Sequence, residues 1–304
     1  VGEYFKTKYK IISNDILYFS YILQKAKIEN KNSLKFSKLK KNGIDNPITY
    51  LNNLKTKNSK NLFIYKNYSP NLKSNRSYFN NDNASKIDLV RITINKWLKE
   101  KKINSQEYYA LLASLIEAIP FISNIAGTYG AYLKKRDKRF FKTLKLEKFE
   151  PLNSKYKNIC FNRNANTLIK KIKGDILYID PPYNGRQYLS NYHVLETIAK
   201  YDNPKIKGLT GLRKSSEGLS VYCHKAKAFN ELEDLIKNAN FKYLIMSYSN
   251  EGIISERNIE KLFKRYGDNN SFKKYKFPYR RYKRTKDKNI KKVYELMFFI
   301  KKNG

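Results

Sequence analysis

The sequence predicts an α/β fold, and three patterns in its 304 residues indicate that class. The run Ile176 to Ile179 is short and almost continuously apolar, as in a strand that is buried on both faces of a sheet. An apolar strand pattern at Tyr9 to Ser13 precedes apolar residues with helical spacing at Ile16 to Leu23. Near the end of the chain, Lys273 to Tyr282 and Lys291 to Ile300 show the pattern of an antiparallel hairpin.

Polar and aromatic residues follow the run at 176–179 directly. The tetrapeptide Asp180 to Tyr183, DPPY, places a carboxylate, two residues without an N–H donor and an aromatic ring at the carboxyl end of that strand. A second strand pattern, Tyr243 to Ser247, is also followed by polar residues at 248–250. Open α/β sheets bind ligands at this edge. The tetrapeptide is also compatible with an ordinary turn, in which the aspartate forms the turn and the prolines end the strand.

The longer segment DILYIDPPYNGRQYLSNYHVLETIA resembles the DPPY segment of the adenine-specific DNA methyltransferases that methylate the N6 amino group with S-adenosylmethionine. The similarity continues through Tyr188, Asn191, Tyr192 and His193. A second segment, FISNIAGTYGAYLKK at 121–135, resembles another part of this class. The resemblance implies a Rossmann-like methyltransferase core that is interrupted by an inserted, mostly helical basic domain.

The domain boundaries follow from the same resemblance. Residues 1–28 and 155–304 are expected to form the catalytic core, and residues 29–154 the inserted region that recognises the target. Within the insertion, Ala84 to Lys101 and Ser105 to Ile119 show helical spacing of apolar residues. Asn104 and Glu107 match a capping box at the start of the second helix.

The resemblance assigns a role to each residue of the motif. The Asp180 carboxylate and the Pro181 carbonyl would accept hydrogen bonds from the adenine amino group and direct its lone pair toward the methyl sulfonium. Pro182 would help to fix the backbone, and Tyr183 would stack on a base that is flipped out of the duplex. Acceptors held in place before the reaction provide electrostatic stabilisation of the transition state. S-adenosylmethionine is the expected cofactor, without a metal ion.

Further cofactor contacts are implied at Asp15, Asn164 and Asp180. In the family an acidic residue at the position of Asp15 contacts the cofactor ribose; the alternative is that Asp15 caps the following helix. Asn164 or Asn166 stands where the family has a carboxylate for the cofactor's adenine amino group. An amide oxygen accepts the same hydrogen bond without charge, so we expect weaker binding.

The start of the chain departs from the family pattern. A first strand and a glycine-rich loop precede the ribose-binding acid in the family, and Gly2 resembles the last residue of that loop. We therefore expect the 304 residues to be a fragment that lacks most of this loop, binds S-adenosylmethionine poorly and has little activity.

The charge of the chain favours a nucleic-acid partner. Lysine and arginine number 63 against 26 acidic residues, a net charge of +37, and 26 tyrosines are interleaved with them. The codon usage of an A+T-rich genome is the alternative explanation for part of the lysine excess. We predict that DNA phosphates contact Lys134, Lys135, Arg136, Arg139, Arg186, Arg280, Arg281, Lys283 and Arg284.

Other functional classes are disfavoured. Two cysteines and two histidines are too few and too scattered for a zinc site or a disulfide framework. No stretch approaches the roughly 20 apolar residues of a membrane helix, and no signal peptide is recognisable. We expect a cytoplasmic monomer.

These observations predict transfer of a methyl group from S-adenosylmethionine to N6 of adenine in double-stranded DNA, in a restriction-modification system with a partner endonuclease. Two alternatives stay open at this point. One is an amino-methyltransferase that acts on RNA or on a protein amide, and the other is a decayed or non-enzymatic basic protein that binds nucleic acid.

Overall fold

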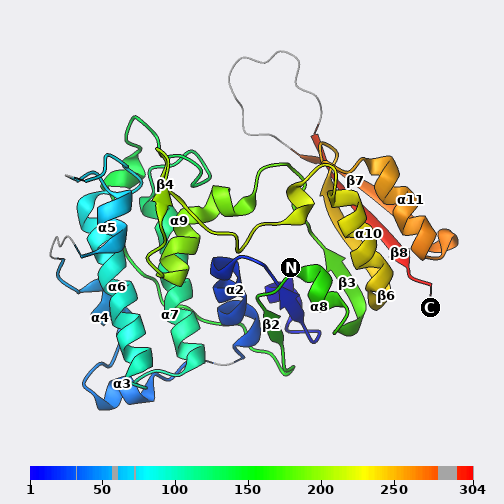
Figure 1. Cartoon of the computed structure of the whole chain (residues 1–304). Helices are drawn as coiled ribbons and strands as arrows, with labels where there is room; N and C mark the ends of the chain where they lie inside the picture. The colour runs from blue at the N-terminus through cyan, green and yellow to red at the C-terminus, as the bar shows by residue number, and fades with distance from the viewer. Residues whose placement is uncertain (32, 57–60, 72, 280–292, 304) are drawn as a thin grey trace. The chain divides into compact units, whose positions relative to one another are not determined.

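The computed structural model describes residues 1–31, 33–56, 61–71, 73–279 and 293–303. The chain divides into two compact units (Figure 1). Unit 1 contains Val1–Asn162 and Leu189–Gly218, and unit 2 contains Arg163–Tyr188 and Leu219–Gly304. Helices and strands occur in both units, so the chain is a mixed α/β protein. The predicted division into a catalytic core and a recognition insertion stays a prediction, because compactness does not assign a role.

Unit 1 is mostly helical. Its elements are α1 (Gly2–Phe5), β1 (Ile12–Asn14), α2 (Tyr18–Gln24), the π-helix η1 (Lys25–Glu29), α3 (Ser37–Lys41), α4 (Pro47–Asn52), α5 (Phe63–Tyr68), α6 (Asn81–Lys99), α7 (Ser105–Ala118), the 3-10 helices η2 (Ile119–Ile122) and η3 (Lys138–Phe141), β2 (Ile159–Phe161), most of α9 (Tyr188–Lys200), β4 (Ile206–Lys207) and β5 (Leu212–Arg213).

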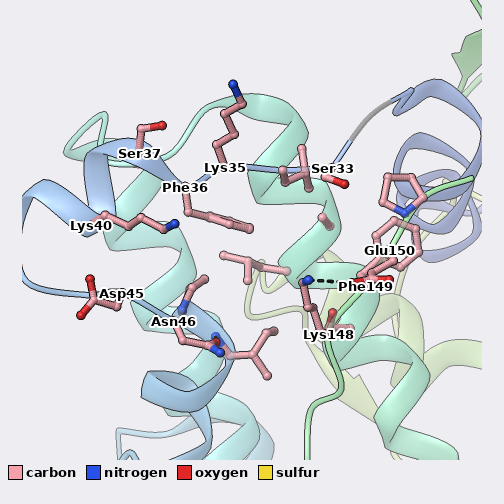
Figure 2. Close-up of a pocket in the computed structure, with 17 residues that line it drawn as sticks. Ser33, Lys35, Phe36, Ser37, Lys40, Asp45, Asn46, Lys148, Phe149 and Glu150 are labelled. Atoms are coloured by element: carbon pink, nitrogen blue, oxygen red, sulfur yellow. Dashed lines mark hydrogen bonds and ion pairs between the residues drawn. The ribbon is translucent and has the colours of Figure 1, made fainter. Parts of the chain in front are cut away.

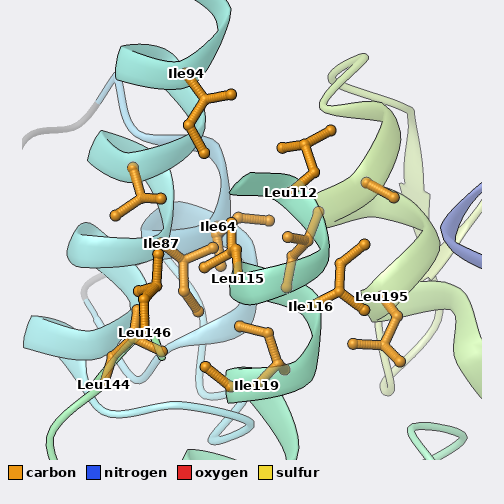
Figure 3. Close-up of a cluster of buried hydrophobic side chains, with 14 of the residues drawn as sticks. Ile64, Ile87, Ile94, Leu112, Leu115, Ile116, Ile119, Leu144, Leu146 and Leu195 are labelled. Atoms are coloured by element: carbon orange, nitrogen blue, oxygen red, sulfur yellow. The ribbon is translucent and has the colours of Figure 1, made fainter. Parts of the chain in front are cut away.

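Helices α6 and α7 form the centre of unit 1. The predicted capping box of α7 is confirmed: the Glu107 N–H donates to Asn104 Oδ1 (2.9 Å), and the Asn104 N–H donates to Glu107 Oε2 (3.0 Å). Apolar side chains at helical spacing then meet between the two helices, including Ile87, Ile94 and Leu115 (Figure 3). Both predicted helices are therefore present, and burial of their apolar faces stabilises them.

Two buried charged residues on α6 bind the ends of neighbouring helices. The Asp88 carboxylate accepts from the N–H groups of Ile64 and Tyr65 (2.9 Å each), at the start of α5. The Arg91 guanidinium donates to the Ile198 and Ala199 carbonyls (2.8 and 3.1 Å), near the end of α9. An anion at a helix N-terminus and a cation at a C-terminus each complement the helix dipole. This arrangement holds α5 and α9 against α6.

Strands β1 and β2 pair in parallel, with Ser13 opposite Cys160. The first strand begins at Ile12 rather than at the predicted Tyr9. It is short because only Ile12, Ser13 and Asn14 have partners on β2.

Unit 2 contains a four-stranded sheet with the order β3-β6-β8-β7. Strands β3 and β6 are parallel, whereas β8 is antiparallel to both β6 and β7. The elements are α8 (Ala165–Ile169), β3 (Lys173–Ile179), η4 (Val221–Cys223), α10 (Ala228–Asn238), β6 (Asn240–Ser249), α11 (Glu256–Tyr266), η5 (Asn269–Ser271), β7 (Lys273–Tyr279) and β8 (Val293–Lys301). The predicted terminal antiparallel pair is confirmed as β7 and β8.

One prediction about β3 is wrong. Ile176 and Tyr178 are 54% and 40% exposed, whereas Ile179 is buried, so the strand is not buried on both faces. Within the described part of unit 2, α10 and α11 contribute to the same core as the inward residues of the sheet, and they lie side by side in Figure 1. Alternate residues of β3 point away from that core.

The described residues include no helix that combines the length and the apolar character needed to cross a bilayer.

Burial raises the pKa of Asp88 to about 6. A carboxyl group whose pKa is higher in the folded protein than in the unfolded chain stabilises the fold most below the unfolded pKa. That contribution is lost as the pH rises through the folded value.

We predict that the advantage of the wild type over Asp88→Asn in free energy of unfolding shrinks by on the order of 1 to 3 kcal/mol between about pH 4 and about pH 7. The variant retains the other titrating groups, so the difference isolates this carboxyl. Urea unfolding across that range measures it. A wild-type advantage that grows with pH would contradict the prediction.

Candidate active site

The DPPY tetrapeptide lies directly after β3, at the carboxyl end of the strand. Because β3 and β6 are parallel, the residues that follow β6 meet it there, as the sequence predicted for 248–250. The Ile253 N–H donates to the Tyr183 carbonyl (2.8 Å), and the rings of Tyr183 and Tyr248 meet edge to face at 6.4 Å. The tetrapeptide is thereby fixed to the loop after β6.

The reactive groups of this segment are accessible. Asp180 is exposed, and Tyr183 is 39% exposed although its backbone is fixed. Burial of Tyr248, which is 2% exposed, provides the support behind the Tyr183 ring. A carboxylate and an aromatic ring therefore reach the surface at this strand end.

The loop after β6 is tight at Gly252. A Cβ at this position would lie 2.7 Å from Cζ of the Tyr248 ring, closer than atoms pack. The Tyr248 hydroxyl in turn accepts from the Ile254 N–H (3.3 Å). Gly252 is thus required for the position of the ring that packs on Tyr183.

The segment after the motif is held by a reciprocal amide pair. Gln187 Nε2 donates to the Ser220 carbonyl (2.9 Å), and the Ser220 N–H donates to Gln187 Oε1 (2.8 Å). The sequence did not identify this pair, since the two residues lie 33 positions apart and neither belongs to a motif. Arg186, a predicted DNA contact, is exposed in this segment.

The two asparagines considered for the cofactor adenine differ in the structure. Asn166 is buried, and its amide donates to the Glu231 carbonyl (2.8 Å) and accepts from the Tyr222 hydroxyl (2.8 Å). Asn164 is exposed and caps α8 by accepting from the Thr167 N–H (3.0 Å). Asn166 therefore has a structural use inside unit 2, whereas the Asn164 side chain, which also accepts from the Thr167 hydroxyl (3.5 Å), lies at the surface.

Asp15 and Gly2 lie in unit 1. The Asp15 carboxylate accepts from the Leu17 N–H (2.8 Å) and the Ser20 hydroxyl (2.6 Å), and burial raises its pKa. These bonds fit the alternative in which Asp15 supports the start of α2. Gly2 is the first residue of α1. The roles of Asp15, Gly2 and Asn164 in one cofactor site stay predictions.

A family model supplies the decisive comparison. The model for D12 class N6 adenine-specific DNA methyltransferases matches residues 1–262. The chain belongs to this family. The family resemblance that the DPPY segment indicated is therefore confirmed.

Curated relatives agree with the family. The chain is 52% identical over 303 residues to the type II methyltransferase M.FokI of Planomicrobium okeanokoites, and 44% identical over 302 residues to the modification methylase StsI of Streptococcus sanguinis. It spans about half the length of these two, covering 47% and 46%. The type II methyltransferase M.NlaIII of Neisseria lactamica is 40% identical over 293 residues, which are 95% of this chain and 82% of that relative. No solved structure gives a significant match.

The basic residues predicted to contact DNA differ in their availability in this D12 class chain. Arg139 donates to Asp137 (2.9 Å) and to the Ile125 carbonyl (2.6 Å), and the Arg136 guanidinium lies 4.9 Å from the Phe140 ring centre. Lys134 and Lys135 are exposed. The four predicted contacts Arg280, Arg281, Lys283 and Arg284 lie outside the described residues.

Neither cysteine is placed for nucleophilic chemistry. Cys160 and Cys223 are both buried, and burial raises the pKa of Cys160 to about 11. A protonated, enclosed thiol is a poor nucleophile. In the ranges that the structure describes, no group of three or more His, Cys, Asp or Glu side chains is arranged to hold a metal ion.

We predict that Gly252→Ala lowers the free energy of unfolding by about 1 to 3 kcal/mol, because the added methyl group displaces the Tyr248 ring. Gly185→Ala is the matched control in the neighbouring loop, where the nearest atom to an added Cβ is the Cys223 carbonyl oxygen at 3.7 Å. Denaturant unfolding of both variants measures the effect. Equal losses in the two variants would show that loop flexibility, and not the Tyr248 contact, matters.

Proposed function

We propose that the protein transfers a methyl group from S-adenosylmethionine to the N6 amino group of adenine in double-stranded DNA. The observation that carries the proposal is that an exposed Asp180 and a Tyr183 ring that is 39% exposed both follow directly on β3, at its carboxyl end, in a D12 class chain. S-adenosylmethionine supplies an electrophilic methyl group.

The residues of the motif orient the base in this proposal. The lone pair of the adenine amino nitrogen is delocalised into the ring, which makes the nitrogen a poor nucleophile. Hydrogen bonds from this group to Asp180 and to the Pro181 carbonyl localise the lone pair and direct it away from the ring. Tyr183 stacks on the flipped base, and Pro182 helps to hold the backbone before the base arrives.

Asp15 and Asn164 offer hydrogen-bond acceptors for the hydroxyl and amino groups of the cofactor. A carboxylate offers about four lone-pair positions, and the hydrogen bonds that Asp15 accepts from the Leu17 N–H, the Ile16 N–H and the Ser20 hydroxyl leave one position for a ribose hydroxyl. The exposed Asn164 oxygen accepts from the Thr167 N–H (3.0 Å) and, over a longer distance, from the Thr167 hydroxyl (3.5 Å), and a ligand donor would take the place of that hydroxyl. We therefore assign the ribose to Asp15 and the cofactor's adenine amino group to Asn164.

The wider organisation follows the same proposal. Residues 1–28 and 155–304 would form a Rossmann-like core, and residues 29–154 a basic, mostly helical region that recognises the target. Relatives named as type II methyltransferases and modification methylases support a place in a restriction-modification system with a partner endonuclease. The protein would act as a monomer in the cytoplasm, where it meets its DNA.

We predict that Asp180→Ala and Tyr183→Ala each abolish or cripple methyl transfer while non-specific DNA binding persists, since loss of base stacking alone is worth about 1–3 kcal/mol. Asp175→Ala is the control, because Asp175 is an exposed carboxylate within the same strand. Transfer of labelled methyl groups to duplexes with and without adenine measures the effect. Full activity of Asp180→Ala would show that the DPPY segment is not the site of methyl transfer. Methylation of RNA but not of DNA would favour RNA as the substrate.

We also predict how DNA affinity depends on salt. Each neutralised phosphate contributes about −0.9 to the slope of log affinity against log salt. Lys134→Gln with Lys135→Gln should therefore flatten the slope by up to about 2. Lys145→Gln is the control, because this exposed lysine is already paired with Glu147 (3.0 Å). Titration of a labelled duplex at several salt concentrations measures the slope. An unchanged slope in the double variant would mean that Lys134 and Lys135 do not contact phosphates and that codon usage explains these lysines.

A further inference from the structure

Unit 1 contains a cavity of about 600 Å³ that the function proposed above does not use. It lies between α3, α4, α7 and the segment from Lys148 to Pro151 (Figure 2). Cavities of this size are typical of small-molecule sites. None of the residues predicted to bind cofactor, adenine or phosphate lines it.

Aromatic and aliphatic side chains form much of the wall. The Phe36 ring points into the cavity, and Phe149 lies across from it (Figure 2). Phe36 has a φ of 48°, in the left-handed region that non-glycine residues rarely adopt. Its N–H donates to Glu107 Oε1 (2.7 Å), a bond that holds this conformation. The backbone that carries the ring is therefore fixed, and the ring forms one side of the cavity.

A buried hydroxyl lies at the wall formed by α7. Ser114 lines the cavity and is 4% exposed, and its Oγ has no hydrogen-bond partner among the described residues. A buried polar atom without a partner is unfavourable, and native proteins rarely retain one. A hydroxyl rotates readily, so a polar group that enters the cavity supplies the missing partner.

The wall formed by α3 and the start of α4 carries a positive charge. The Lys40 amine points toward the cavity and the Asp45 carboxylate points away (Figure 2). Lys148 is neutralised by Glu150 (2.6 Å), whereas in the part of the chain that the structure describes Lys40 forms no ion pair. Asn46 Oδ1 accepts from the Ile48 and Thr49 N–H groups (3.0 and 3.1 Å), which leaves the amide NH₂ as a donor.

We propose that this cavity binds one nucleotide unit. The base would lie against Phe36, its polar edge would bond to the Ser114 hydroxyl and the Asn46 amide, and the phosphate would meet Lys40. Either a free nucleotide or an extrahelical nucleotide of DNA provides this chemistry. The proposal does not depend on methyl transfer, because the residues that carry it are separate from the DPPY motif.

Calorimetric titration with 2′-deoxynucleoside 5′-monophosphates tests the site. Ser114→Ala should keep or raise the melting temperature, because an unsatisfied hydroxyl is removed, yet weaken nucleotide binding about 2- to 10-fold, the worth of one hydrogen bond. Lys40→Gln should weaken binding about 10-fold, in line with a charge-assisted bond. Lys41→Gln is the matched control, an exposed lysine of α3 that does not line the cavity.

Two duplexes distinguish the sources of the nucleotide. If DNA supplies it, a duplex with one bulged nucleotide binds more tightly than its fully paired counterpart, and Lys40→Gln removes the difference. If free nucleotide is the ligand, the monophosphate binds and the two duplexes do not differ. Absence of saturable binding by every nucleotide and duplex, or equal effects of the Lys40 and Lys41 substitutions, overturns the proposal. Retained nucleotide binding in Asp180→Ala separates this site from the proposed methyl transfer.

Discussion

The parallel pairing of β3 with β6 is the constraint on which the candidate active site depends. It places the carboxyl ends of both strands at one edge, where the loop after β6 fixes the backbone of Tyr183 and supports its ring with Tyr248. Exposed strand ends would otherwise be mobile. The motif can therefore present a carboxylate and an aromatic face to solvent while its backbone stays ordered, the condition that orientation of a weak nucleophile requires.

Unit 1 uses a different principle, in which buried charges bind helix ends. Asp88 and Arg91 on α6 complete the start of α5 and the end of α9. Glu196 on α9 does the same for α2, accepting from the Tyr18 and Phe19 N–H groups (3.1 and 3.0 Å). Free backbone groups at helix ends need partners when they are buried. These side chains supply partners that apolar packing cannot, and they fix which helix ends meet.

The charged side chains of this protein differ in whether they are available to a partner. A net charge of +37 suggests a uniformly basic surface, yet several cations already have partners within the protein. Arg139 is held by Asp137, whereas Lys134 and Lys135 nearby are exposed. The share of the charge that is available to phosphates is therefore smaller than composition implies, and only the folded chain identifies it.

The sequence by itself determined the family, because the chemistry of the DPPY motif resides in four consecutive residues. It also determined the structural features that depend on residues close together in the chain. The capping box of α7 and the terminal strand pair belong to this class, because both depend on local backbone preference. Tertiary structure alone decided that one face of β3 is exposed, that Asn166 is committed to Tyr222 and Glu231, and that the segments at 33–48, 110–114 and 148–151 enclose a cavity. These outcomes depend on partners far apart in the chain, whose meeting is set by packing and leaves no periodic signal in the sequence.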